Sequence, residues 1–361
     1  MKILVDIGHP AHIHYFKNCA RILIAKGYQF LFVVRERDST IELIQSTGFD
    51  YVSRGKGGKG LLRKLLAIPK IDYIVYRIAK EFEPDIFLSF SSPYAAHVAT
   101  LMRKPHIAFD DSEHAILGQW MYRPFTDIVL SPSCYNAKIW KNQYLFSSYM
   151  ELCYLHPNYY TPNPGILDQL KISRDEKYCV LRLISWDANH DIGQHGLYYS
   201  DKIRIVKELS KMCKVYISSE GELPNELERY KLPIHPSQLH DALSYASLYI
   251  GEGGTTASES AVLGTPAIRV NSINNGLFED EYKYGLLVTM MDVNEIIRKA
   301  KEILSQDKDL YHKRREKLIK EKIDPTAFMV WLLENYPNSK EIIKTNPDFQ
   351  NKLTNNEIQA N

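Results

Sequence analysis

The segment 248–266 combines glycine, threonine and glutamate at a spacing that suits a bound nucleotide diphosphate. Its apolar start, Leu248–Gly251, predicts a strand, and the residues after the glycines predict a helix. Glycines let the backbone approach a ligand closely, and the unpaired amides of the first helical turn attract an anion, while a carboxylate one turn further is placed to bind ribose hydroxyls. The alternative is an ordinary strand-to-helix connection capped by a threonine. The residues predicted to bind this nucleotide diphosphate, the donor of a group-transfer reaction, are Gly253, Gly254, Thr255, Thr256 and Glu259.

Three histidines directly follow the first predicted strand, within the sequence Gly8-His-Pro-Ala-His-Ile-His-Tyr-Phe16. The carboxyl end of a parallel strand is where open α/β sheets bind ligands. Because histidine titrates near neutrality, His12 or His14 is the predicted general base towards an acceptor hydroxyl, and His9 is a predicted acceptor contact. Two alternatives stay open, which are a metal-ligand pair at His12 and His14 and a purely structural set of histidines.

A second polar cluster ends another predicted strand, in the window His106–His114. Clustered carboxylates at a strand end bind sugar hydroxyls, act as acid or base, or hold a divalent cation. We assign Asp110 and Glu113 to the acceptor and keep Asp111 as the reserve general base. These carboxylates are equally suited to capping the following helix.

The loop after the first strand of the second half is dense in hydrogen-bond donors. Loops that carry so many donors often bind ligands. We therefore predict that Ser185 and His195, together with the nearby Arg182, contact the phosphate or sugar of the donor.

The segment Arg54–Gly60 contains a literal G-x-G-x-x-G. A dinucleotide fingerprint follows the first strand and has an acidic residue about 20 positions later, and neither condition is met. We interpret the segment as a basic loop that closes over an anionic acceptor, with Lys56 and Lys59 as contacts. The P-loop pattern G-x-x-x-x-G-K-[ST] is absent from the sequence, so a P-loop NTPase is not supported.

These candidates require a scaffold of parallel strands. Short apolar runs recur between helix-like segments in both halves, and such runs suit parallel strands covered on both faces. Two α/β halves follow, with the ligand expected in the cleft between them. The predicted strands are Ile3–Ile7, Phe30–Val34, Asp85–Phe90, His106–Phe109, Asp127–Leu130, Tyr178–Ser185, Lys214–Ser218, Leu248–Gly251 and Ala267–Val270.

The stretch His156–Gly165 has three prolines and cannot continue a helix or a central strand, so we place the hinge there. The predicted domains are an acceptor-side Rossmann-like domain at 1–160 and a nucleotide-sugar-binding Rossmann-like domain at 161–335. Residues 336–361 are polar and charged, and they predict a frayed tail.

The bulk composition fits a two-domain globular protein of 361 residues. A net charge of +2 is far from that of a dedicated nucleic-acid binder. The five cysteines are scattered without a C-x-x-C pair, which predicts reduced core thiols.

No signal-peptide pattern or membrane-spanning apolar run is present in the sequence, which predicts a cytoplasmic protein. Segment 61–80 mixes apolar and basic residues, and both a contact with the membrane surface and a solvated helix face stay open.

Five segments resemble one family of predicted bacterial and archaeal glycosyltransferases, which is catalogued mainly as a domain of unknown function. They are Ile7–His14, Glu151–Pro162, Ser185–Gly193, Tyr216–Pro224 and Gly253–Glu259. The resemblance runs to about residue 335. It implies a GT-B fold, in which two Rossmann-like domains face each other across a cleft, akin to UDP-N-acetylglucosamine 2-epimerase and the lipid-linked N-acetylglucosaminyltransferase of peptidoglycan synthesis.

By similarity, the donor nucleotide lies against the glycine turn at 253–254, the segment Ile234–His240 with His235 lies beside its base, and the first-strand loop faces the acceptor. The function implied is a metal-independent glycosyltransferase without a cofactor, which uses a nucleoside-diphosphate sugar, with UDP favoured, and a glycan or lipid-linked acceptor of the cell surface. Alternatives are a 2-epimerase acting on a UDP-sugar, with the carboxylates at 110–113 moving protons, and a non-catalytic nucleotide-sugar binding protein.

Overall fold

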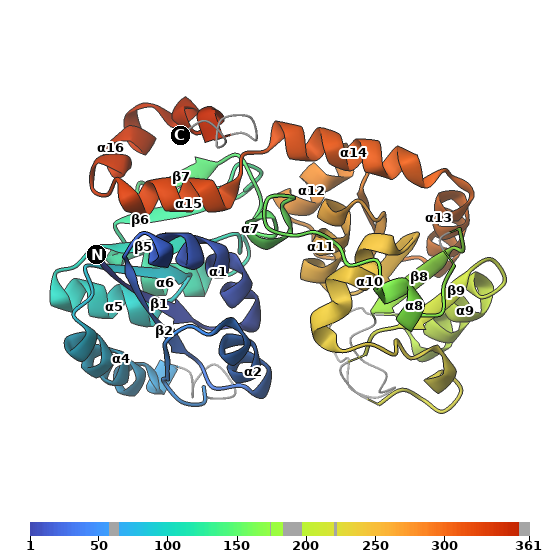
Figure 1. The fold of residues 1–361 in the computed structure, drawn as a ribbon, viewed down its shortest axis with the longest axis horizontal. Coiled ribbons are helices and arrows are strands. Elements are labelled where there is room, and N and C mark those ends of the chain that lie inside the picture. Colours follow the sequence, from blue (N-terminus) through green and yellow to red (C-terminus); the bar gives the residue numbers. More distant parts are fainter. Residues whose placement is uncertain (58–64, 174, 183–196, 220–221, 354–361) are drawn as a thin grey trace. The chain divides into compact units, whose positions relative to one another are not determined.

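The computed structural model describes residues 1–57, 65–173, 175–182, 197–219 and 222–353. The chain forms two compact units (Figure 1), with 1–154 and 322–361 in unit 1 and 155–321 in unit 2. Each unit is an α/β structure with a parallel sheet of its own. The domains predicted at 1–160 and 161–335 stay predictions, because a compact unit does not reveal which ligand it binds.

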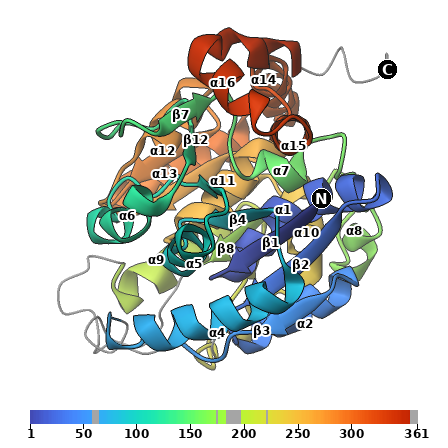
Figure 2. The ribbon, with the colours of Figure 1, turned by 90° about the vertical axis from the view of Figure 1, so that its left-hand side faces the viewer.

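Unit 1 holds a sheet in the order β3-β2-β1-β4-β5-β6-β7, and its neighbouring strands pair in parallel. Figure 2 shows β1 and β2 side by side. The strand order reverses between β1 and β4, and such a switch point is where open α/β sheets bind ligands. The strands are β1 (Lys2–Ile7), β2 (Gln29–Val34), β3 (Tyr51–Ser53), β4 (Ile86–Phe90), β5 (His106–Phe109), β6 (Ile128–Pro132) and β7 (Gln143–Phe146).

The helices of unit 1 connect these strands and cover the sheet. Several begin with a residue that satisfies the first amides, as His9 does for α1 and Ser92 does for α5. They are α1 (Pro10–Ala25), α2 (Asp38–Thr47), α4 (Ile68–Phe82), α5 (Pro93–Met102), α6 (Ile116–Tyr122), the 3₁₀ helix η1 (Arg123–Phe125), α15 (Pro325–Glu334), α16 (Asn338–Thr345) and η4 (Pro347–Leu353), with α7 (Leu152–Leu155) at the unit boundary.

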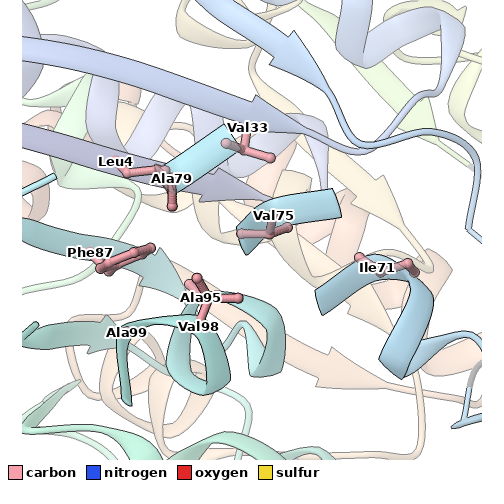
Figure 3. Close-up of a cluster of buried hydrophobic side chains, with 9 residues drawn as sticks. All are labelled: Leu4, Val33, Ile71, Val75, Ala79, Phe87, Ala95, Val98 and Ala99. Carbon is pink, nitrogen blue, oxygen red and sulfur yellow. The ribbon is translucent and has the colours of Figure 1, made fainter. Parts of the chain in front are cut away.

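Part of the unit 1 core lies between the sheet and two helices (Figure 3). Helix α4 carries buried residues at a four-residue spacing, which places Ile71, Val75 and Ala79 on one face. They pack with Phe87 of the sheet and with Ala95 of α5. Full burial of an aliphatic side chain stabilises the fold by about 1.5–3 kcal/mol, so this face holds α4 to the sheet edge that carries the candidate site.

The chain returns to unit 1 at its C-terminal end. Helix α15 packs against α1, and Thr326 donates a hydrogen bond from its hydroxyl to the carbonyl of Cys153 at 2.9 Å. Beyond it the sequence predicts a frayed tail, but the structure has α16 and η4 there. The ring of Phe349 lies 4.3 Å from that of Trp331, and Gln350 accepts a hydrogen bond from the amide of Ser147. The prediction was wrong for 338–353 because a few apolar anchors suffice to dock a polar helix.

Unit 2 holds a smaller parallel sheet in the order β12-β11-β10-β8-β9. The strand order reverses between β8 and β10, so the switch point lies at the carboxyl ends of these two strands. The strands are β8 (Tyr178–Arg182), β9 (Lys214–Ile217), β10 (Leu248–Gly251), β11 (Ala267–Val270) and β12 (Leu287–Met290). The helices are α8 (Ile166–Gln169), α9 (Tyr199–Leu209), η2 (Glu228–Tyr230), η3 (Pro236–Gln238), α10 (Leu239–Tyr245), α11 (Gly254–Leu263), α12 (Gly276–Lys283), α13 (Val293–Ser305) and α14 (Lys308–Glu321).

Every predicted strand corresponds to an observed one, and most limits agree, while the others within the described residues differ by one or two positions. The end of the strand predicted at Tyr178–Ser185 lies outside the described residues. Three observed strands were not predicted, namely β3, β7 and β12, and each stands at the edge of its sheet. In the described part of the chain, no helix has the length and apolar character required to cross a membrane.

Candidate functional site

A cavity of about 330 Å³ lies at the carboxyl edge of the unit 1 sheet, beside the switch point. The strands deliver its lining residues in order across the sheet, because a residue that directly follows a parallel strand lies at this edge. Arg54 follows β3, Arg35 follows β2, His9 follows β1 and Ser92 follows β4. Four neighbouring strands therefore converge on one polar cavity.

Two of the three predicted histidines, His9 and His12, line this cavity. His9 is the N-cap of α1 and accepts a hydrogen bond at Nδ1 from the amide of Ala11 at 3.2 Å. His12 accepts at Nδ1 from the amide of Gly8 at 3.4 Å. Burial, followed by the charges of His9 and Arg54, lowers the pKa of His12 from 6.5 to about 3. His12 is therefore a neutral imidazole at physiological pH, with its proton on Nε2.

The third histidine, His14, is not among the cavity-lining residues. Its Nδ1 lies 3.1 Å from the ammonium nitrogen of Lys17, and its ring stacks on Tyr154 with centroids 5.1 Å apart. The three-residue spacing from His9 to His12 keeps those two near one another on the first turn of α1, whereas His14 leaves that face. The roles of base predicted for His12 and His14 are not tested by this geometry and stay predictions.

Asp110 follows β5 and has no exposed surface. One carboxylate oxygen, Oδ1, accepts from the hydroxyl of Ser91 at 3.0 Å and from the amide of Ser112 at 2.9 Å. The other, Oδ2, accepts from the hydroxyl of Tyr122 and from Nη2 of Arg123, each at 2.6 Å. This network couples Asp110 to η1 and α6, a structural role that differs from the predicted contact with an acceptor.

Asp111 and Glu113 are partly exposed. Asp111 accepts from the hydroxyl of Ser112 at 3.4 Å, and Ser112 lines the cavity. Burial, followed by the neighbouring charge of Asp110, raises the pKa of Asp111 from 3.8 to about 7. Glu113 accepts from the amide of Asn136 at 2.9 Å. Of these two, Asp111 has the protonation behaviour that suits an acid or base near neutrality.

The basic loop predicted to close over an acceptor is described only to Gly57. Lys56 is exposed and is not a lining residue, whereas Gly57 lines the cavity. Lys59 and the last glycine of the literal G-x-G-x-x-G lie outside the described residues. The structure therefore leaves the predicted roles of Lys56 and Lys59 untested.

In unit 2, the predicted strand, glycine turn and helix are β10, residues 252–253 and α11. Gly253 is the N-cap of α11 and offers no side chain to the first amides, those of Gly254, Thr255 and Thr256. A Cβ on Gly254 would lie 2.7 Å from Cζ of Phe278, so the ring of α12 packs directly on this turn. From Thr256 to Leu263 every residue is buried, which fixes the helix in place while its N-terminus meets the sheet edge.

The structure describes three further residues that were predicted to bind the donor. Arg182 ends β8, pairs in register with Gly251, and donates from Nη1 to the hydroxyl of Ser218 at 2.8 Å. Glu259 lies in α11 with Oε1 3.0 Å from Nε2 of His240. His235 is exposed and caps η3. The predicted contacts Ser185 and His195 lie outside the described residues.

Sequence reasoning missed four residues at these sites, namely Asp6, Arg35, Ser92 and His240. Asp6 lies within β1 and accepts at Oδ1 from Nε of Arg54 at 2.8 Å, and the hydroxyl of Ser92 donates to its Oδ2. A serine before a proline directly after an apolar strand is a signal for a helix start, so Ser92 was open to prediction. The pairing of His240 with Glu259 joins residues of two helices and carries no local signal.

Among the described residues, no group of three or more His, Cys, Asp or Glu side chains is arranged to hold a metal ion. The five cysteines are free, and Cys19, Cys153 and Cys179 are buried. The polar groups gathered at the two sheet edges are guanidinium, imidazole, hydroxyl, carboxylate and backbone amide. This set binds anions and sugar hydroxyls and moves protons.

Comparison with solved structures identifies the fold. MurG of Acinetobacter baumannii has a TM-score of 0.59 and 14% identity, covering 92% of this chain and 99% of its own. UDP-GlcNAc 2-epimerase of Methanocaldococcus jannaschii has a TM-score of 0.61 and 11% identity, covering 85% of this chain and 94% of its own. These likenesses and the two parallel sheets show an α/β protein of the GT-B class, with two Rossmann-like units.

Sequence comparison adds one curated relative, an uncharacterised protein of Methanocaldococcus jannaschii. It is 24% identical over 354 residues, which cover 93% of this chain and 98% of the relative. The family model described as protein of unknown function DUF354 matches residues 1–338. The match spans both sheets and both candidate sites, and the chain belongs to the DUF354 family.

Proposed function

We propose that this protein is a metal-independent glycosyltransferase, which moves a sugar from a nucleoside-diphosphate donor to a hydroxyl of a cell-surface glycan or lipid-linked acceptor. The observation that carries the proposal is the uncapped N-terminus of α11 at the switch point of unit 2. A buried helix whose N-cap is a glycine, with no side chain to accept from the first amides, is suited to a diphosphate. UDP is the proposed nucleotide, since the 2-epimerase of similar fold is named for a UDP-sugar.

On the donor side, the amides of Thr255 and Thr256 stabilise the negative charge that develops on the departing diphosphate. Arg182 lies on the adjacent strand and adds positive charge at the same edge. Glu259 binds the ribose hydroxyls, with His240 holding its Oε1. The proposal also includes Gly253 and Gly254 for close backbone approach, His235 beside the base, and Ser185 and His195, which lie outside the described residues.

On the acceptor side, the ligand occupies the cavity of unit 1. The acceptor oxygen bonds to the anomeric carbon while the bond from that carbon to the diphosphate oxygen breaks, and the nucleoside diphosphate leaves with the electron pair. The acceptor proton passes to a base. Asp111, with a pKa of about 7, suits this step better than His12, whose pKa of about 3 makes it a poor proton acceptor. His9 and His12 then act as acceptor contacts, with Nε2–H of His12 donating.

The first test is thermal stabilisation of the full chain by nucleoside diphosphates and nucleotide sugars. A ligand that binds only the folded state raises the melting temperature in proportion to the logarithm of its concentration above Kd. We expect a selective shift with one nucleotide, and loss of that shift in Gly254→Ala, because the added Cβ would meet Phe278. No shift with any nucleotide, or an equal shift in Gly254→Ala, would refute the donor site.

A second candidate is a UDP-N-acetylglucosamine 2-epimerase, favoured by the adjacent carboxylates and by the fold likeness. The network around Asp110 leaves Asp111 and Glu113 to move protons in that reaction. Formation of an epimer from the UDP-sugar alone, without acceptor, would identify it. Tight binding with neither transfer nor epimerisation would instead identify a nucleotide-sugar binding protein.

We also propose peripheral contact with the inner face of the membrane through α4. Its exposed residues include three cations, an aromatic ring and one acid, namely Lys70, Tyr73, Arg77, Lys80 and Glu81, and Leu66 before it is 73% exposed. Basic residues beside exposed apolar groups bind anionic lipid surfaces. We expect the chain to sediment with anionic vesicles and not with neutral ones. Recovery with neither would leave α4 as a solvated face, and equal recovery with both would exclude the basic residues as the reason for binding.

A further inference from the structure

The unit 1 cavity contains two arginine side chains with unused hydrogen-bonding capacity. Arg54 is 5% exposed and its Nε donates to Asp6. Among the described residues, it donates from no other atom, so its two Nη groups are left towards the cavity that it lines. The ring of Tyr94 lies 4.6 Å from its guanidinium carbon and holds the plane from the side.

Arg35 contributes the second guanidinium. Its Nε is buried and has no hydrogen-bond partner among the described residues. Burial, followed by the charges of Arg37 and Arg54, lowers the pKa of Arg35. A buried donor without an acceptor is unfavourable, and more so when it is charged, so this arrangement gains stability from an anion.

Gly57 explains how Arg35 is positioned. A Cβ at this residue would lie 2.4 Å from Nε and 2.5 Å from Cζ of Arg35. The bare backbone of Gly57 therefore lies directly against the guanidinium, and any side chain there would displace it. Packing against Arg35 therefore explains the glycine at position 57 without a dinucleotide-binding motif.

The charge of the cavity is positive. Among the lining residues, Asp6 is the acidic one, and it accepts from Nε of Arg54. Both α1 and α5 begin at the cavity, through His9 and Ser92, and add the positive ends of their dipoles. Asp6 neutralises one arginine through the Nε contact, which leaves one formal positive charge for a ligand.

We propose that this cavity binds an anionic group, a phosphate or a carboxylate, of a sugar-sized ligand between Arg35 and Arg54. In the context of the proposed function, on which this step rests, that ligand is the acceptor, so the transferase uses an acidic acceptor. The volume of about 330 Å³ exceeds that of one phosphate and lies in the range of small-ligand sites. Planar guanidinium groups bind both anions in two-pronged geometry.

The test is calorimetric titration of the full chain with glucose 1-phosphate, with glucuronic acid, and with glucose as the neutral control. We expect one of the two anions to bind and glucose not to bind. Binding of glucose 1-phosphate alone identifies a phosphorylated acceptor, and binding of glucuronic acid alone identifies a uronic acid. Binding of neither anion, or equal binding of glucose, would overturn the proposal.

Variants locate the site. Arg35→Gln removes one charged hydrogen-bond donor. It should raise the Kd of the bound anion by at least about tenfold. Arg37→Gln is the matched control, because it removes the same charge from an exposed neighbour that does not line the cavity, and it should change Kd by less than about twofold. Gly57→Ala keeps the charge but displaces Arg35, and it should weaken binding as Arg35→Gln does. Wild-type affinity in both Arg35→Gln and Gly57→Ala would refute the site.

The same variants separate this inference from the donor proposal. The UDP-dependent rise in melting temperature should persist in Arg35→Gln and disappear in Gly254→Ala. If UDP fails to bind while glucose 1-phosphate binds in an Arg35-dependent way, the transferase proposal fails and the anion site stands. If UDP binds and both anions fail, the acidic acceptor is excluded and the donor site stands.

Discussion

Replacing Asp111 with asparagine should make the fold more stable above neutral pH. The pKa of this carboxyl is raised from 3.8 to about 7 by burial and by Asp110. In the folded protein Asp111 therefore holds its proton over a pH range where the unfolded chain has released it. Stability falls as pH rises through that range, because the folded state binds more protons. An asparagine side chain does not titrate, so its contribution to stability stays constant over the same range.

The size of the effect follows from the two pKa values. The difference between a pKa of 3.8 and one of about 7 corresponds to a loss of at most about 4 kcal/mol in the free energy of unfolding above pH 7. Asp111 is partly exposed, and solvent screening reduces the value, so we expect about 2 kcal/mol. The gain should grow by about 1–2 kcal/mol between about pH 5 and about pH 8.

Urea unfolding of Asp111→Asn and of the parent at those two pH values measures this difference. The companion variant is Asp110→Asn, which breaks the buried pair with Arg123 and leaves the hydroxyl of Tyr122 facing an amide. It should destabilise the fold by about 3–5 kcal/mol at either pH. If Asp111→Asn destabilises the protein at pH 8, or if the two variants change stability in the same direction, the raised pKa assigned to Asp111 is wrong.

Three other changes have defined outcomes. Ser92→Ala removes both the cap of α5 and a hydrogen bond to Asp6, and it should cost about 1–2 kcal/mol in urea unfolding; an unchanged midpoint would contradict the network. Glu259→Gln should weaken nucleotide binding by at least about tenfold in calorimetry, and equal affinity would remove Glu259 from the donor site. Lys26→Ala breaks an exposed pair with Glu334 and should change stability by less than about 1 kcal/mol; a larger loss would show that the pair anchors α15.

The interior strands could be predicted from the sequence because they are apolar on both faces. Strands such as β5 and β10 were predicted with the limits that the structure has. The edge strands β3, β7 and β12 lack that signal, since one side of an edge strand has no neighbouring strand and their residues are partly exposed. The periodicity of the sequence reports burial, and burial is weaker at the edges. The edge strand β9 was predicted because Val215 and Ile217 are buried at alternate positions.

The missed edge strand had a direct consequence for the site. Pairing of β2 with β3 places the amide of Arg54 on the carbonyl of Val34 at 2.9 Å, and pairing of β1 with β2 places the amide of Arg35 on the carbonyl of Ile7 at 2.9 Å. These registers bring two arginines that are 19 positions apart to one cavity. Without β3, Arg54 is interpreted as the first residue of a basic loop.

The two aspartates after β5, Asp110 and Asp111, have different surroundings in the structure, and the sequence did not distinguish their roles. Both were predicted to act on the acceptor side because both follow the same strand. The structure separates them by their partners. Asp110 accepts from Tyr122 and Arg123, which come later in the chain, whereas Asp111 accepts from Ser112, which lines the cavity. A carboxylate that accepts from four donors is held in place, and its charge contributes to the raised pKa of its neighbour. The buried network around Asp110 therefore supports the proposed chemistry through Asp111, by keeping a negative charge fixed next to the carboxyl that must release and accept protons near neutrality.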